Sequence, residues 1–277
     1  MALATDETFA GLFELNPEGE TTVDVQYLVD DRYPVVVVDN FYKRPDAVRD
    51  FALGLAFEGE RGLYPGRDAA IPADTRTFFD RIEALYNRVY PSPMRLVPPY
   101  LPGEFVFSIL TTRFSDFDRR QRVPHTDSGW LAGLVYLNLP DQCSGGTAIY
   151  RHRETGLVWA PISNPAAHNP AYARRISEII DGGAGWREIS AVMDRNGLRS
   201  VAELPQLIYR HNDEQLEPIA GTTKHWELLR GIDMRFNRFV MYPGCVFHAG
   251  LAKPDAFGER IHERRLTQNI FIVWPRI

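Results

Sequence analysis

The feature that most constrains the fold is a series of short apolar segments, rich in β-branched and aromatic residues, that recur after Glu104 with turn residues between them. Segments this short suit strands better than helices, and their spacing is typical of an antiparallel sandwich or barrel. The sequence therefore predicts a β core with strands at residues 105–114, 133–139, 147–152, 238–242, 245–249 and 265–274.

The residues before this core predict one more strand and two helices. Valine-rich residues 34–42 are typical of a buried strand. Apolar residues then recur at intervals of three and four over 46–55 and 75–89, which predicts amphipathic helices. Residues 58–73 are rich in glycine, proline and charge and predict a loop.

Residues 161–235 interrupt the strand pattern. They contain helix-like stretches at 172–180 and 186–193, separated by a glycine-rich hinge at 182–185. A connection this long is usually functional or folds as a unit of its own. We expect a single α+β domain over residues 1–277, in which 161–235 form a helical insertion that covers the core as a lid.

Composition narrows the possible partners and location. The net charge of −5 gives no basic field for nucleic acid, and two cysteines are too few for a disulfide framework. The first residues do not resemble a signal peptide, and no apolar stretch approaches the roughly 20 residues that cross a bilayer. We expect a cytoplasmic protein with no nucleic-acid or membrane partner, and the sequence leaves the oligomeric state open.

A His-x-Asp pair carries the chemistry. His125 and Asp127 lie two positions apart, and on an extended backbone their side chains project to the same face. One imidazole and one carboxylate can bind one cation, and His248 is the best candidate for a third ligand. Two histidines and a carboxylate leave three coordination positions open, as in non-haem Fe(II) oxygenases. The other histidines are interpreted as surface or structural residues: His152, His168, His211, His225 and His262.

The order of motifs around these ligands is informative. Three segments lie in order between the His-x-Asp pair and His248: a Tyr-Leu-Asn strand at 134–138, a Gly-Gly-x-Thr-like turn that begins at Gly145, and a strand that ends in Pro-Gly at 237–244. This order resembles the 2-oxoglutarate and Fe(II)-dependent oxygenase superfamily, in its prolyl-hydroxylase-like branch, over residues 104–273 without the insertion. The first strand and helix are also similar to those of uncharacterised bacterial members.

The resemblance implies a fold, an activity and cofactors. The fold would be a double-stranded β-helix, that is, a cupin-like jelly roll, with an N-terminal helical layer. The activity would be a dioxygenase that uses Fe(II), 2-oxoglutarate and O₂ to hydroxylate a small molecule, an amino acid or a peptide. Asp127 supplies the carboxylate that related halogenases lack, so the resemblance favours hydroxylation over halogenation.

In that family a basic residue beyond the distal histidine holds the far carboxylate of 2-oxoglutarate. Arg265 is preferred here because it opens the last predicted strand, where alternation places Thr267 on the same face. Arg260 is the second choice, and Tyr136 could donate a hydrogen bond to the cosubstrate. Lys253 and Arg264 are further candidates, and a solvated basic cluster over residues 260–265 is the alternative.

Two other functions fit the same residues. The chain could be a non-catalytic metal- or ligand-binding protein on a cupin-like barrel, which would not turn over 2-oxoglutarate. It could also be a cupin-like enzyme that uses another metal and no keto acid, for which Arg265 would be dispensable.

Overall fold

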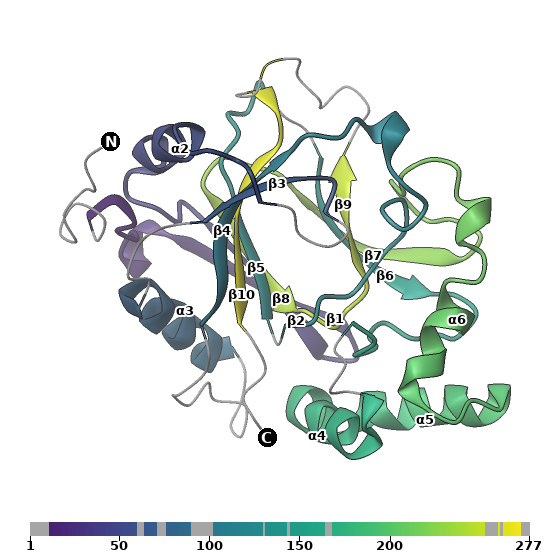
Figure 1. Cartoon of the computed structure of the whole chain (residues 1–277). Coiled ribbons are helices and arrows are strands. Elements are labelled where there is room, and N and C mark those ends of the chain that lie inside the picture. The colour runs from purple at the N-terminus through teal and green to yellow at the C-terminus, as the bar shows by residue number, and fades with distance from the viewer. Residues whose placement is uncertain are drawn as a thin grey trace.

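The computed structural model describes residues 11–59, 64–70, 76–89, 102–129, 131–142, 145–163, 168–252, 260 and 263–272. Within these ranges the chain is an α+β protein with two antiparallel sheets, one of seven strands and one of three (Figure 1). None of the described helices is both long enough and apolar enough to cross a membrane.

The seven-stranded sheet contains the valine-rich strand and most of the predicted core strands. Its order is β1 (Thr22–Val29), β2 (Arg32–Asp39), β8 (Arg238–Pro243), β5 (Leu131–Tyr136), β10 (Leu266–Ile272), β4 (Pro102–Leu110) and β3 (Gly66–Ala70). Every pairing is antiparallel. Val35 and Val36 in β2 are buried, as the apolar run predicts.

The three-stranded sheet has the order β7 (Trp226–Asp233), β6 (Gly145–His152) and β9 (His248–Ala252). After β5 the chain passes to β6 and β7, returns to the large sheet at β8, and crosses again at β9 and at β10. The buried hydroxyls of Tyr136 on β5 and Thr147 on β6 lie 2.7 Å apart and join the two sheets. The sheets therefore face each other across a shared interior.

The N-terminal helices cover the outer face of the large sheet. Helices α2 (Pro45–Leu53) and α3 (Arg76–Val89) lie to the left of strands β4, β10 and β5 in Figure 1. Phe51 on α2 packs against Phe107 on β4 and against Phe13, with ring centroids about 6 Å apart. Both predicted helices are confirmed, and they form the expected layer.

The remaining helices, α4 (Pro170–Asp181), α5 (Ala184–Asn196) and α6 (Leu204–Ile208), gather at the lower right of Figure 1. Gly182 ends α4 and Gly183 precedes α5, both with positive φ, so the predicted hinge is a tight corner between two helices. The buried Asp181 carboxylate accepts hydrogen bonds from the Tyr33 hydroxyl and the Gly185 N–H, both at 2.8 Å. These bonds fasten the helices to the start of β2.

The largest differences between the structure and the sequence prediction lie in three segments. Residues 58–73 contain β3, because Gly66–Ala70 pairs with β4 along its full length. The helical insertion is shorter than predicted, since residues 226–233 form β7 and pair with β6. Residues 22–29 form an edge strand that the sequence did not predict. The lid role of the insertion stays a prediction.

Candidate metal centre

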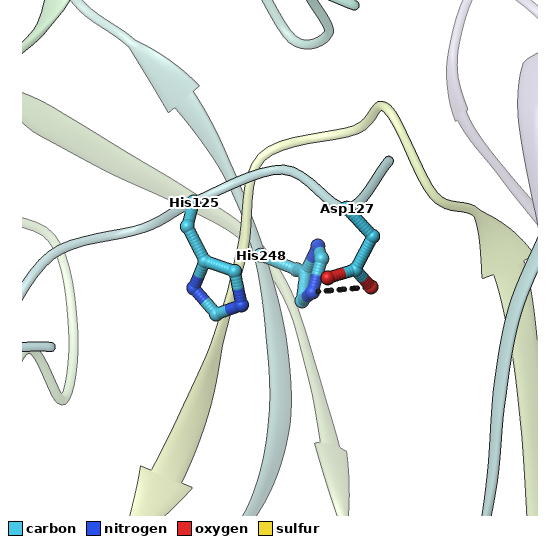
Figure 2. A group of neighbouring side chains, drawn as sticks. All are labelled: His125, Asp127 and His248. Atoms are coloured by element: carbon cyan, nitrogen blue, oxygen red, sulfur yellow. Dashed lines mark ion pairs between the residues drawn. The ribbon is translucent and has the colours of Figure 1, made fainter. Parts of the chain in front are cut away.

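Backbone pairing brings the two predicted histidine ligands together. His125 and His248 form an isolated antiparallel bridge, in which each N–H donates to the other carbonyl, at 2.8 and 2.9 Å. Residues paired in this way project their side chains to the same face. The two imidazole centroids accordingly lie 4.4 Å apart, on neighbouring segments (Figure 2).

Asp127 completes the group from the same extended segment. Its Oδ2 lies 3.3 Å from His248 Nε2, the contact drawn as a dashed line in Figure 2. The intervening Thr126 is buried and its hydroxyl lies 2.8 Å from that of Ser163. The three residues offer ligand atoms that lie within 4.8 Å of one another. The predicted convergence of His125, Asp127 and His248 is therefore confirmed as geometry.

A close approach of two glycines holds Asp127 in place. The Asp127 N–H donates to the Gly244 carbonyl at 2.7 Å. A Cβ atom at Gly244 would lie 2.5 Å from the Gly129 carbonyl oxygen, which is closer than any side chain can approach. The Pro-Gly end of β8 is thus a packing requirement of the site.

The tautomer of His248 prepares its other nitrogen for a cation. Nδ1 lies 2.9 Å from the Val246 carbonyl, which can only accept, so Nδ1 carries the hydrogen. In the neutral ring Nε2 then presents a lone pair to the Asp127 carboxylate at 3.3 Å. Two acceptors at this distance need a cation between them.

Either a proton or a divalent metal can fill that position. Burial would lower the pKa of His248, but the adjacent carboxylate of Asp127 outweighs it and raises that pKa. Metal bonds of about 2.1 Å at right angles would place neighbouring ligand atoms about 3 Å apart. The 3.3 Å separation of His248 Nε2 and Asp127 Oδ2 is close to this spacing, and a ring nitrogen of His125 lies within 4.8 Å of both atoms.

The two histidines should titrate far apart in the metal-free protein. Burial, and then the charge of His248, lower the pKa of His125 to about 4. Between about pH 6.5 and 4 the unfolded chain therefore binds a proton at His125 that the folded chain does not, and stability should fall as the pH falls. His248 has the opposite sign: its contribution is complete below about pH 6.5 and is lost as the pH rises through its raised pKa.

Imidazole NMR titration checks this expectation, with urea unfolding measured over the same pH range. The loss of stability toward pH 4 should be smaller in His125→Gln than in the wild-type protein. A midpoint for His125 near its ordinary value of about 6.5 would contradict the assigned environment.

Aromatic side chains lie between the candidate metal centre and Arg265. The Tyr242 ring on β8 lies 4.8 Å from the His248 ring, a neighbour that the sequence did not reveal. Burial raises the pKa of Tyr242 well above its usual range, so its hydroxyl stays protonated. Arg265 precedes β10, and its guanidinium carbon lies 5.7 Å from the centroid of the Tyr136 ring.

The other predicted cosubstrate residues separate into two groups. Thr267 is aligned with Tyr136 in the sheet, and its buried hydroxyl has no hydrogen-bond partner among the described residues. Arg260 is exposed, and its backbone N–H donates to the nearby Glu263 side chain at 3.1 Å. The structure thus places Arg265, Tyr136 and Thr267 at one end of β10 and gives no contact between Arg260 and them. Lys253 lies outside the described residues.

Comparison with known proteins identifies a family without a known activity. A family model described as "Family of unknown function (DUF6445)" matches residues 19–179 and 190–272. All three candidate ligands and Arg265 lie within the matched ranges. No curated protein matches the sequence.

Proposed function

The chain belongs to the DUF6445 family of unknown function, and we propose that it is a non-haem Fe(II), 2-oxoglutarate-dependent dioxygenase. The observation that carries this proposal is the convergence of His125, Asp127 and His248, with His248 Nδ1 already committed to a backbone carbonyl. Two imidazoles and one carboxylate on one side of an ion leave three positions for a chelating cosubstrate and O₂. The substrate would be a small molecule, an amino acid or a peptide.

The strand order supports a double-stranded β-helix. Strands β4, β10, β5 and β8 are consecutive neighbours in the large sheet, and β7, β6 and β9 form the small one. The bridge from His125 to β9 adds a fourth segment to the small sheet. We interpret these eight segments as a jelly roll, with β1 and β2 extending one side of the large sheet and β3 the other.

Each named side chain has a role in this proposal. His125, Asp127 and His248 would hold the iron. Arg265, half-buried beside Tyr136, would pair with the far carboxylate of 2-oxoglutarate, because a buried dicarboxylate requires a cation and hydrogen-bond donors. The protonated hydroxyl of Tyr136 or Thr267 could supply such a donor. When bound, iron and 2-oxoglutarate supply the oxidation of a substrate C–H bond by O₂, with succinate and CO₂ as coproducts.

Anaerobic titration tests the proposal before any substrate is known. Adding 2-oxoglutarate to the Fe(II)-loaded protein should produce a visible charge-transfer band, and a screen of candidate substrates should then reveal succinate release. A protein that binds Fe(II) without forming this band would instead be a metal-binding protein or a cupin-like enzyme that uses no keto acid.

Arg265→Gln should weaken 2-oxoglutarate binding by roughly 10- to 100-fold, because a charge-assisted pair is lost inside the protein. Fe(II) affinity should stay near the wild-type value, since Arg265 is not a metal ligand. Arg260→Gln is the matched control, because that arginine is exposed and should have no effect. Titration of the charge-transfer band measures both variants, and equal cosubstrate affinities for the two would overturn the role of Arg265.

A further inference from the structure

A second convergent group lies outside the candidate metal centre. His211, Glu214 and His225 come from the 3-10 turn Asn212–Glu214, the residue before it, and the residue before β7. His211 Nδ1 lies 2.7 Å from Glu214 Oε1, and His225 Nε2 lies 3.0 Å from Glu214 Oε2. The two rings stack with centroids 4.5 Å apart. The interpretation of these histidines as surface or structural residues did not include their convergence on Glu214.

The chemistry of this group suits a transition metal. Two imidazole nitrogens and a carboxylate form a common ligand set for Zn²⁺, and the ligand atoms lie within 4.8 Å of one another. The side chains of His225, His211 and Glu214 are 19, 35 and 46% exposed, so an ion can enter and water can complete its coordination.

We propose that His211, Glu214 and His225 form a second metal site, which takes Zn²⁺ or a similar divalent transition metal. The ion would connect the turn that follows α6 to the residues that lead into β7. The site would therefore fasten the end of the helical segment to the three-stranded sheet, a structural role separate from the proposed oxygenase chemistry.

Two basic side chains contact the residues of this group when no metal is bound. Lys224 Nζ lies 2.9 Å from Glu214 Oε2, and Arg210 Nε lies 3.0 Å from His211 Nε2. An incoming ion must displace the Lys224 ammonium from the Glu214 carboxylate. It must also replace the ring hydrogens of His211 and His225 that face that carboxylate. Lys224 is 75% exposed and can turn into solvent, whereas Arg210 already has a second partner in Glu154. Lys224→Gln should therefore tighten metal binding, because it removes a competing cation.

The test uses the full chain carrying His125→Ala and His248→Ala, which disable the candidate iron centre. Calorimetric titration with Zn²⁺ should give one saturable site, and Co²⁺ should give visible absorption typical of a bound ion. Adding His211→Ala and His225→Ala should abolish both signals. In the wild-type chain these last two substitutions should reduce zinc stoichiometry from two ions to one.

The matched control is His168→Ala, which removes an exposed histidine outside both groups. It should leave zinc stoichiometry unchanged. Zn²⁺ should raise the unfolding temperature of this control protein, and it should raise the unfolding temperature of His211→Ala by a smaller amount. Absence of saturable zinc binding after the iron centre is disabled would overturn the second site, as would binding that survives loss of His211 and His225. Neither result bears on the oxygenase proposal. The candidate iron ligands His125 and His248 are removed in this test, and Fe(II) binding is measured in a separate experiment.

Discussion

His248→Ala should lower Fe(II) affinity by at least about 100-fold, because residues that only support metal ligands already contribute 10- to 100-fold. His248 is the residue on which the centre depends most. It is 5% exposed, pairs through its backbone with His125, and directs Nε2 at Asp127. Turnover of 2-oxoglutarate should be lost together with the metal. Anaerobic Fe(II) titration and succinate assay measure the two effects.

The control for this variant is again His168→Ala, which removes one imidazole without touching the centre. It should bind Fe(II) as the wild-type protein does. Circular dichroism should show that the His248→Ala chain keeps its secondary structure, so that a loss of affinity reports on the ligand. Wild-type Fe(II) affinity in a folded His248→Ala protein would refute the ligand assignment.

Trp159→Ala should reduce the free energy of unfolding by about 3–5 kcal/mol, because a large, fully buried side chain would leave a cavity. The indole packs beside Tyr33, with ring centroids 6.4 Å apart. It also packs so closely on α5 that a Cβ atom at Gly185 would lie 1.8 Å from its Nε1. Trp159 further forms a backbone bridge with Val246, two residues before His248, the proposed ligand. The variant should therefore loosen the helices and the metal centre together.

Trp186→Ala provides the comparison, since that indole lies on α5, the helix that Trp159 packs against, but is only partly buried. It should cost less than half as much stability as Trp159→Ala, because less apolar surface is lost from the interior. Urea unfolding gives the free energy of unfolding of each variant, provided that the dependence of that free energy on urea concentration has the same slope in both. Equal losses would show that Trp159 does not join the helices to the β core.

The sequence predicted the parts of the fold whose pattern is local. Valine-rich β2 and the amphipathic helices α2 and α3 could be predicted because their burial follows the order of apolar residues. Strand β3 could not, because Gly66–Ala70 has a composition poor in strand formers and depends on pairing with β4. The edge strand β1 does carry a local signal, since polar and apolar residues alternate over residues 22–26, and that strand was missed.

In the site, too, local sequence patterns predicted some features and missed those that depend on contacts between distant segments. The shared face of His125 and Asp127 follows from alternation along an extended backbone, and the motif order supplied His248. The Tyr242 ring and the Gly129–Gly244 contact arise only when distant segments meet, so no local pattern revealed them. The second group contains the spacing His211-x-x-Glu214, a local signal that points to metal binding only when His225 is placed beside it.

Anomalous diffraction from crystals grown anaerobically with Fe(II) tests the central claim most directly. The account predicts an iron peak bonded at about 2.0–2.2 Å to one nitrogen each of His125 and His248 and to the Asp127 carboxylate. Loaded crystals with no iron between these three side chains, or with iron bound only elsewhere, would contradict it.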